Sequence, residues 1–271
     1  MSEEGNLALF CDFENIALGV RDARYAKFDI QLVLEHLLVK GSIVTKKAYC
    51  DWDRYKEFKA VMHEAAFELI EIPHVRMSGK NSADIRMVVD ALDLCYTKEH
   101  IDTFVIISGD SDFSPLVSKL RENAKTVIGV GVKNSTSDLL IANCDEFIYY
   151  DDLAAKPTPA KKKSKKTRTK KSASKQSETK KDRADPMQEG IDLVLDTTEA
   201  LYSERGDRSK LWGSMIKQTL KRRMPQFNES YYGFGSFNDL LLEAQARNLI
   251  ELEMDERSGG YIVRSVKRNA G

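Results

Sequence analysis

Apolar and polar positions alternate in blocks along the first 150 residues. Short apolar runs typical of buried strands occupy residues 6–11, 43–49, 68–73, 103–107 and 126–131, with a short edge piece at 146–149. Between these runs, apolar residues recur at three- and four-residue spacing, which predicts helices at 31–40, 53–66, 82–97, 113–123 and 136–143. Strands that alternate with helices predict an α/β fold, in which helices cover both faces of a parallel sheet.

A different pattern begins at residue 187. Helical periodicity predicts three helices, at residues 188–204, 209–223 and 236–248. Two short apolar runs follow, Leu249–Met254 and Tyr261–Val263, and the polar, glycine-containing residues 255–260 between them predict a hairpin turn. Three helices followed by a β-hairpin are typical of a small winged-helix domain, a variant of the helix-turn-helix plan.

The segment that joins these two patterns differs from both in composition. Residues 154–183 hold 13 Lys and Arg against 2 Asp and Glu, and no large apolar residue occurs before Met187. Such a segment cannot form a core, so we expect a basic, disordered linker. The predicted parts are therefore an α/β domain at 1–153, a linker at 154–186 and a small helical domain at 187–266.

The net charge of zero conceals a contrast between these parts. Residues 1–153 hold 17 Lys and Arg against 26 Asp and Glu, so an acidic domain precedes the basic linker. Runs of lysine are usually solvated spacers. A basic linker also gives salt-sensitive, sequence-independent attraction to nucleic acid, because each phosphate contact releases counterions.

The cysteines and the hydropathy limit the class of protein. No apolar run approaches the length of a membrane span, and the acidic first residues do not resemble a secretory signal. Cys11, Cys50, Cys95 and Cys144 lie far apart and form no CxxC pair, which favours buried free thiols over disulfides or zinc ligands. We therefore expect a cytoplasmic protein without a membrane partner, and we assign none of the four histidines a catalytic function.

Acidic residues follow the strands and begin one helix. Asp110 and Asp112 lie in the small-residue turn after strand 103–107, Asp12 follows the first strand, and Asp84 begins a helix. Two carboxylates 4 Å apart repel each other by about 4 kcal/mol at an effective dielectric constant near 20. A divalent ion relieves this repulsion, and oxygen ligands suit Mg²⁺ or Mn²⁺. The pattern therefore predicts a metal site formed by these four aspartates.

Several of these acids have a simpler interpretation. An aspartate after a strand often caps the next helix, and for Asp112 a cap and a metal ligand are equally favoured. Glu14, Asp90 and Asp93 are weaker candidates, because a solvated helix face accounts for at least one of the last two. Residues 16–29 are expected to form a long basic connection beside Asp12 that either grips a nucleic-acid backbone or is an ordinary surface loop.

Residues 6–150 resemble the NYN domain, a branch of the PIN-like nucleases. The matching segments are Asp12-Phe13-Glu14-Asn15, Lys80-Asn81-Ser82-Ala83-Asp84 with Asp90 and Asp93, and Ser108-Gly109-Asp110-Ser111-Asp112-Phe113. The resemblance implies a metal-dependent ribonuclease in which Asp12, Asp84, Asp110 and Asp112 are the acidic metal set. It also implies that Asn15 is the polar partner of the first acid. Phe13 replaces the small residue usual in this family, and we expect it to narrow the approach to Asp12.

Residues 187–266 resemble the LOTUS domain, also called OST-HTH, which implies an accessory RNA-binding module. The matching segments are Leu220–Phe227, Tyr231–Phe234 and Phe237–Leu241. Cations beside aromatic side chains are a common means of holding RNA. The candidate RNA contacts along the whole chain are Lys80, Ser108, Lys217, Lys221, Arg222, Arg223, Tyr231 and Tyr232. In the alternative interpretation, Tyr231 anchors a turn, Phe234 and Phe237 belong to the core, and Lys80 is an ordinary exposed lysine.

The leading hypothesis is a metal-dependent endoribonuclease with an RNA-binding domain. In it Asn15 orients a water or a carboxylate, and Ser108 shapes its turn and touches phosphate. The main rival is a catalytically inactive RNA-binding regulator of the same fold. A phosphatase with Asp12 as nucleophile is a third hypothesis, but Glu14 stands where that chemistry normally has a second aspartate. The sequence leaves open whether the chain forms a homodimer.

Overall fold

The computed structural model describes residues 5–25, 27–72, 82–155, 185–205, 210–255 and 259–267. The chain divides into two compact units: the first holds the residues up to Ala154 together with Lys217–Phe227, and the second holds the other residues after Ala154. We describe each unit by itself. Lys80 and nearly all of the predicted linker lie outside the described residues.

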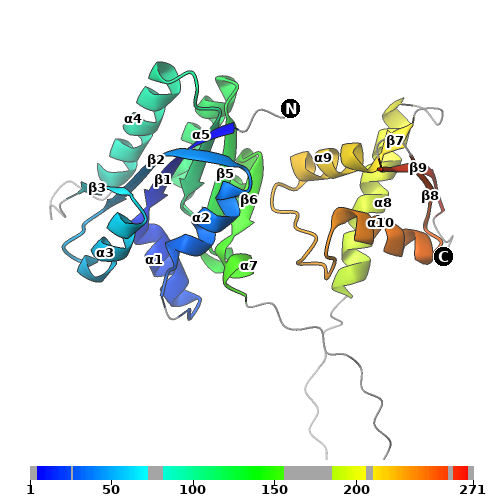
Figure 1. Ribbon diagram of the computed structural model, residues 1–271, viewed down its shortest axis with the longest axis horizontal. Coiled ribbons are helices and arrows are strands. Elements are labelled where there is room, and N and C mark those ends of the chain that lie inside the picture. Colours follow the sequence, from blue (N-terminus) through cyan, green and yellow to red (C-terminus); the bar gives the residue numbers. More distant parts are fainter. Residues whose placement is uncertain are drawn as a thin grey trace, which may run out of the picture. The chain divides into compact units, whose positions relative to one another are not determined.

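A six-stranded parallel sheet forms the centre of the first unit (Figure 1). Its strands are β1 (Gly5–Asp12), β2 (Gly41–Cys50), β3 (Glu68–Glu71), β4 (Thr103–Ile107), β5 (Thr126–Gly131) and β6 (Glu146–Tyr149). They lie in the order β3-β2-β1-β4-β5-β6, which confirms the predicted α/β class. The order reverses between β1 and β4, and such a switch point is where open α/β sheets bind ligands, outside the carboxyl ends of the strands.

Helices cover both faces of this sheet, as predicted. One face carries α1 (Phe13–Asp22), α2 (Ile30–Leu38), α3 (Lys56–Glu64) and α7 (Tyr150–Ala154). The other face carries α4 (Ser82–Thr97), α5 (Ser114–Glu122) and α6 (Asp138–Asn143). Two single 3₁₀ turns, η1 (Ser111–Phe113) and η2 (Lys133–Ser135), follow β4 and β5. Most predicted boundaries lie within three residues of the observed ones.

The alternation of side chains along β1 produces two separate hydrophobic cores. Leu7, Leu9 and Cys11 belong to the core under α1 and α2, whereas Ala8 and Phe10 belong to the core under α4 and α5. Successive side chains of a strand point to opposite faces, so a strand covered on both sides must be apolar throughout. Every one of these five side chains is at most 1% exposed, which places β1 at the centre of the fold.

Helix α1 corrects one sequence prediction. Residues 16–29 were expected to form a long connection, but Phe13–Asp22 is helical. Phe13, Ile16 and Val20 are buried at the i, i+3 and i+7 spacing of one helix face. Asp12 caps the helix, because its side chain accepts a hydrogen bond from the Asn15 N–H.

The part of the chain after the predicted linker combines helices with a small antiparallel sheet. Its elements are α8 (Pro186–Arg205), β7 (Leu211–Trp212), α9 (Gly213–Arg223), α10 (Phe237–Ala246), β8 (Ile250–Met254) and β9 (Tyr261–Val266). The predicted antiparallel pairing of the last two strands is confirmed, although turn residues 256–258 lie outside the described residues. The helix predicted to begin at 209 begins at Gly213, because Leu211 and Trp212 pair with β9 instead.

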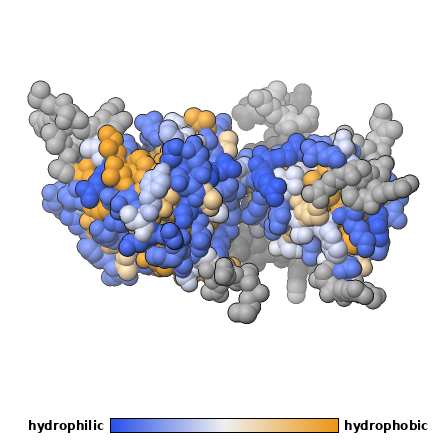
Figure 2. Space-filling view, turned by 90° about the horizontal axis from the view of Figure 1, so that it is seen from above, coloured by the Kyte–Doolittle hydropathy of each residue, from blue (hydrophilic) through white to orange (hydrophobic). Residues whose placement is uncertain are grey.

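The four cysteines are buried and free, as predicted. Within the part of the chain that the structure describes, every helix is too short or too polar to cross a membrane. Figure 2 shows one face of the molecule, which is mainly hydrophilic and carries small hydrophobic patches.

Candidate functional site

Asp12 lies at the carboxyl end of β1 and is only 8% exposed. Its Oδ1 accepts a hydrogen bond from the Asn15 N–H at 3.3 Å, and its Oδ2 accepts one from the Ser108 hydroxyl at 3.1 Å. The pKa of this carboxyl is raised to about 7, mainly by burial and also by the charges of Asp84 and Asp110, while the two hydrogen bonds oppose the increase. Asp12 therefore caps helix α1, and its ionised form is disfavoured by burial and by the nearby charges of Asp84 and Asp110.

The turn after β4 carries the next two acids and is tied to Asp12. Ser108 is fully buried, and its hydroxyl accepts a hydrogen bond from the Asp110 N–H at 3.2 Å while donating to Asp12. The Oδ1 of Asp110 accepts the Asp112 N–H at 2.9 Å, so Asp110 caps the following 3₁₀ turn. The RNA contact predicted for Ser108 is wrong, because this hydroxyl is enclosed and joins two acid-bearing segments.

Asn15 links helix α1 to the same turn. Its side-chain oxygen accepts the Gly109 N–H at 2.9 Å, so that oxygen fixes the turn rather than a water or a carboxylate. A Cβ atom at Gly109 would lie 2.4 Å from the backbone oxygen of Ser135, which explains the glycine in the Ser-Gly-Asp segment. Asn15 and Ser108 together hold the ends of β1 and β4 in one arrangement.

Asp84 brings the third segment to this edge. It lies in the first turn of α4, where burial and then the charges of Asp110 and Asp112 raise its pKa to about 6. Asp12, Asp84 and Asp110 are therefore close enough to affect one another's ionisation, although they are up to 98 residues apart in the sequence. Asp112 is exposed at the margin of this group.

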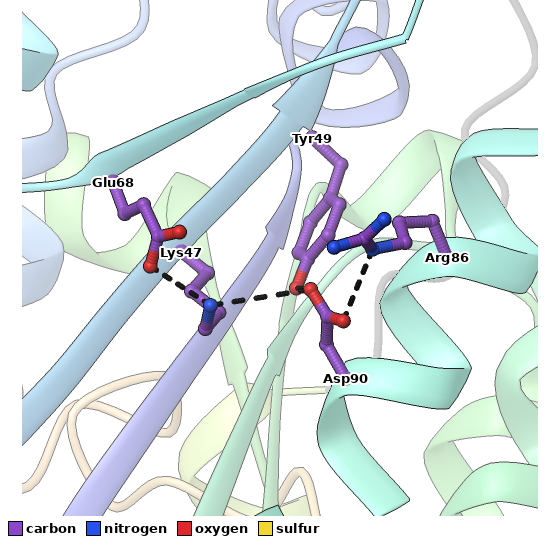
Figure 3. Close-up of polar contacts among 5 residues, drawn as sticks. All are labelled: Lys47, Tyr49, Glu68, Arg86 and Asp90. Atoms are coloured by element: carbon purple, nitrogen blue, oxygen red, sulfur yellow. Dashed lines mark hydrogen bonds and ion pairs between the residues drawn. The ribbon is translucent and has the colours of Figure 1, made fainter. Parts of the chain in front are cut away.

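A polar network anchors α4 to the sheet (Figure 3). The Tyr49 hydroxyl donates to Asp90 Oδ2 at 2.9 Å, and Arg86 Nε donates to Asp90 Oδ1 at 3.1 Å. The Lys47 ammonium lies 2.8 Å from Glu68 and 4.0 Å from Asp90. Asp90 thus ties α4 to β2, and Lys47 extends the network to Glu68 on β3. Asp93 lies on the exposed side of the same helix, as its solvated-face interpretation predicted.

Glu14 also faces the acidic edge, because its charge contributes to the raised pKa of Asp84. It forms an ion pair with Arg54, whose Nη1 lies 3.1 Å from Glu14 Oε1. Sequence reasoning missed Arg54, a half-exposed cation that forms an ion pair with Glu14. Its only signal was its place in the loop after β2, since residues that follow parallel strands gather at one edge of a sheet.

Phe13 does not line this edge. Its ring is fully buried, with centroids 5.0 Å from those of Trp52 and Phe58. The expectation that Phe13 narrows the approach to Asp12 is therefore wrong. The Phe13 side chain lies on the hydrophobic face of α1 and belongs to the core.

The chemistry of the acids suits Mg²⁺ or Mn²⁺, but their spacing does not form a closed cage. Among the described residues, no group of three or more His, Cys, Asp or Glu side chains lies close enough to hold a metal ion. The four predicted ligands therefore do not surround one point. Magnesium often keeps several waters and is held by one or two carboxylates together with substrate phosphates, and this arrangement fits that kind of site.

The predicted RNA contacts after the linker differ in exposure. Arg222 and Arg223 are exposed on α9, whereas Lys217 and Lys221 are partly exposed. Tyr231 is 57% exposed, but Tyr232 is 6% exposed and packs closely against Gly190, so the contact predicted for Tyr232 is wrong. Phe234 and Phe237 are buried, in agreement with their core interpretation.

The strand order and the acids at the ends of β1 and β4 define a PIN-like α/β domain, a fold of nuclease type. Residues 6–151 match the NYN domain, and the chain belongs to that family. This match covers more than half of the chain.

Individual relatives are distant. A stretch of 153 residues is 26% identical to meiosis regulator and mRNA stability factor 1 of Xenopus tropicalis, covering 56% of this chain and 9% of that protein. A stretch of 138 residues is 28% identical to an uncharacterised protein of Methanocaldococcus jannaschii, covering 51% of this chain and 52% of that protein. A protein of unknown function from Vibrio parahaemolyticus has a similar crystal structure, with a TM-score of 0.50, 26% identity and coverage of 56% of this chain and 97% of that one. The chain therefore spans about half or less of the length of these two curated relatives.

Proposed function

We propose that the chain is a metal-dependent ribonuclease that hydrolyses RNA phosphodiester bonds at the edge formed by Asp12, Asp84 and Asp110. The observation that carries this proposal is the convergence of three acids from separate segments, two of which have raised pKa values. The mutual repulsion of these carboxylates is unfavourable in a purely structural site, and a bound cation relieves it. Membership of the NYN family supports the same conclusion.

A bound Mg²⁺ or Mn²⁺ would stabilise negative charge on the phosphate and lower the pKa of an attacking water. In this proposal Asp12 and Asp84 hold the ion, with Asp110 and Asp112 completing the acidic set. Ser108 and Asn15 are positioning residues, since they fix the carboxylate of Asp12 and the turn that carries Asp110.

In the same proposal, the residues after 153 provide accessory RNA binding. The resemblance of residues 187–266 to LOTUS domains and the exposed Arg222, Arg223 and Tyr231 support this part. Residues 154–183 hold 13 Lys and Arg against 2 Asp and Glu, and they offset the repulsion between RNA and the acidic first unit.

The test is cleavage of end-labelled single-stranded RNA by the full chain with Mn²⁺ or Mg²⁺. We expect Asp110→Asn to lower the rate on the order of a hundredfold or more, because it removes a carboxylate of the acidic set that holds the cation at the reacting phosphate. Asp93→Asn, an exposed change on α4, is the matched control and should leave the rate unchanged. Equal rates for Asp110→Asn and wild type would refute the proposal. Hydrolysis of a small phosphomonoester instead of RNA would support the phosphatase hypothesis.

A catalytically inactive RNA-binding regulator is the second candidate. The observation that favours it is that the described acids do not gather three metal ligands around one point. This candidate predicts that wild type and Asp110→Asn bind RNA equally and that neither cleaves it. The same assay, read by fluorescence anisotropy as well as by cleavage, therefore separates the two functions.

A further inference from the structure

A groove of about 710 Å³ begins at Asp84 and Asp112 and runs between α4 and α5 towards α6. Its volume lies within the range of small-molecule and nucleotide sites. Two of the proposed catalytic acids, Asp84 and Asp112, therefore form one end of this groove.

The other walls of the groove are mainly apolar. Ile85 and Val89, one helical turn apart on α4, are 63% and 56% exposed, and Leu139 on α6 is 57% exposed. Isolated exposed apolar side chains are ordinary, but a group of them around a hollow marks a binding surface. No Lys or Arg occurs among the described residues that line the groove, so its walls offer no cation to a phosphate.

One polar group in the wall has no partner. Ser114 is 6% exposed, and its hydroxyl oxygen is buried without a hydrogen bond among the described residues. A buried polar atom without a partner is unfavourable, so most such atoms in proteins are hydrogen-bonded. Because this oxygen is enclosed, it lies behind the groove surface, and the lining offers aliphatic side chains together with Ser111, Ser118 and the two carboxylates.

We propose that this groove holds one unpaired nucleobase of the RNA, next to the phosphate at Asp84 and Asp112. The inference rests on the ribonuclease function proposed above. Base and phosphate belong to the same nucleotide or to adjacent ones, so a strand with its phosphate at the acids brings a base to the mouth of the groove. The exposed aliphatic side chains of the groove contact the faces of the planar base.

The charge at the end of the groove argues for RNA over a protein partner. A protein surface seated on Ile85 and Val89 would also cover Asp84 and Asp112, and burying unpaired carboxylates is strongly unfavourable. In the proposed function, a divalent cation held by the acids neutralises their charge and attracts the phosphate of the RNA. A base within a duplex is stacked and paired, so the groove selects single-stranded RNA and tolerates many sequences.

The first test is a double-mutant cycle between the groove and the base in the full chain. Val89→Asn changes the exposed wall, and Val39→Asn, at an 88% exposed site on α2's end, is the matched control. The substrates are a single-stranded RNA and the same RNA with one abasic nucleotide beside the cleaved bond. For wild type, we expect the abasic change to lower kcat/KM on the order of tenfold.

For Val89→Asn the same abasic change should have little further effect, because the contact is already lost. The control should respond as wild type does. If the abasic nucleotide lowers kcat/KM of Val89→Asn by the same factor as it lowers that of wild type, the two changes act independently and the inference is overturned. If Asp110→Asn cleaves as fast as wild type, the proposed function fails, and that result does not depend on the groove.

A second test does not require cleavage. Full-length protein is irradiated with single-stranded RNA that carries one 4-thiouridine, and the crosslinked peptides are identified by mass spectrometry. Crosslinks to α4 or α6 near Val89 or Leu139 support the inference, and crosslinks found only in other elements overturn it. A dimer in sedimentation that Val89→Asn converts to a monomer would make the groove a self-interface and would also overturn it.

Discussion

The raised pKa of Asp12 predicts that the acidic edge destabilises the metal-free protein. Burial raises this pKa from 3.8 to about 7, so the folded state binds the proton more tightly than the unfolded state. The stabilisation from this proton is fully present below pH 3.8 and is lost as the pH rises through about 7. Replacing Asp12 with the neutral, equally shaped Asn should therefore stabilise the metal-free fold at high pH.

The size of the effect follows from the two pKa values. A shift from 3.8 to about 7 corresponds to about 4 kcal/mol of unfolding free energy at pH 8 and about 2 kcal/mol at pH 5. Asn keeps the oxygen that accepts the Asn15 N–H, and its amide can donate to the Ser108 hydroxyl. The substitution thus removes the charge and preserves the hydrogen-bonding positions.

The assay is urea unfolding at both pH values in the presence of EDTA. Trp52 is 1% exposed in the first unit, so its fluorescence reports this unit once Trp212 is replaced by Phe in both proteins. Asp93→Asn in the same background is the control for loss of an exposed charge. Saturating Mn²⁺ should stabilise the protein with Asp12 more than Asp12→Asn, because only the former keeps the carboxylate.

An Asp12→Asn protein that is no more stable than its parent at pH 8 would refute the reasoning. An equal gain at pH 5 and pH 8 would refute it as well, because titration of a buried acid requires the gain to grow with pH.

Two further changes test the supports of the site. Gly109→Ala should destabilise the first unit by about 1–3 kcal/mol, since its Cβ would lie 2.4 Å from the Ser135 backbone oxygen, and an unchanged melting temperature would contradict this packing argument. Asp90→Asn should lower the unfolding free energy by about 1–3 kcal/mol, because it weakens charge-assisted bonds from Tyr49 and Arg86, and urea unfolding followed through Trp52 measures the loss. If Asp90 were instead a metal ligand, Asp90→Asn would abolish cleavage at full stability.

The sheet, most helices and the position of the acids followed from the sequence because they depend on local patterns. Strands covered on both faces are continuous apolar runs, and acids that follow such strands must lie at one edge of a parallel sheet. Helix α1 had a helical signal in Phe13, Ile16 and Val20, but Arg21 at its end and Arg24 and Lys27 beyond it suggested a basic loop. Strand β7 has only two residues and is too short to produce a pattern.

The supporting contacts depend on distances that the sequence does not contain. Ser108 and Asp12 are 96 residues apart, and only their meeting in space decides that the hydroxyl binds an acid instead of a phosphate. Tyr231 and Tyr232 are neighbours of identical chemistry, yet only the second is buried, because Gly190 leaves room for its side chain. The same limit applies to Arg54, whose ion pair with Glu14 spans 40 residues.

Helix α4 carries Asp84 at its first turn and Ile85 and Val89 just beyond, while Asp90 ties the same helix to the sheet. These side chains belong to one rigid helix. A ligand in the groove that shifts α4 therefore also shifts the carboxylate of Asp84. Asp12 and Asp110 are held by the two innermost strands and cannot follow. The separation of the acids, and with it their hold on a cation, is therefore mechanically linked to whatever fills the adjacent hollow.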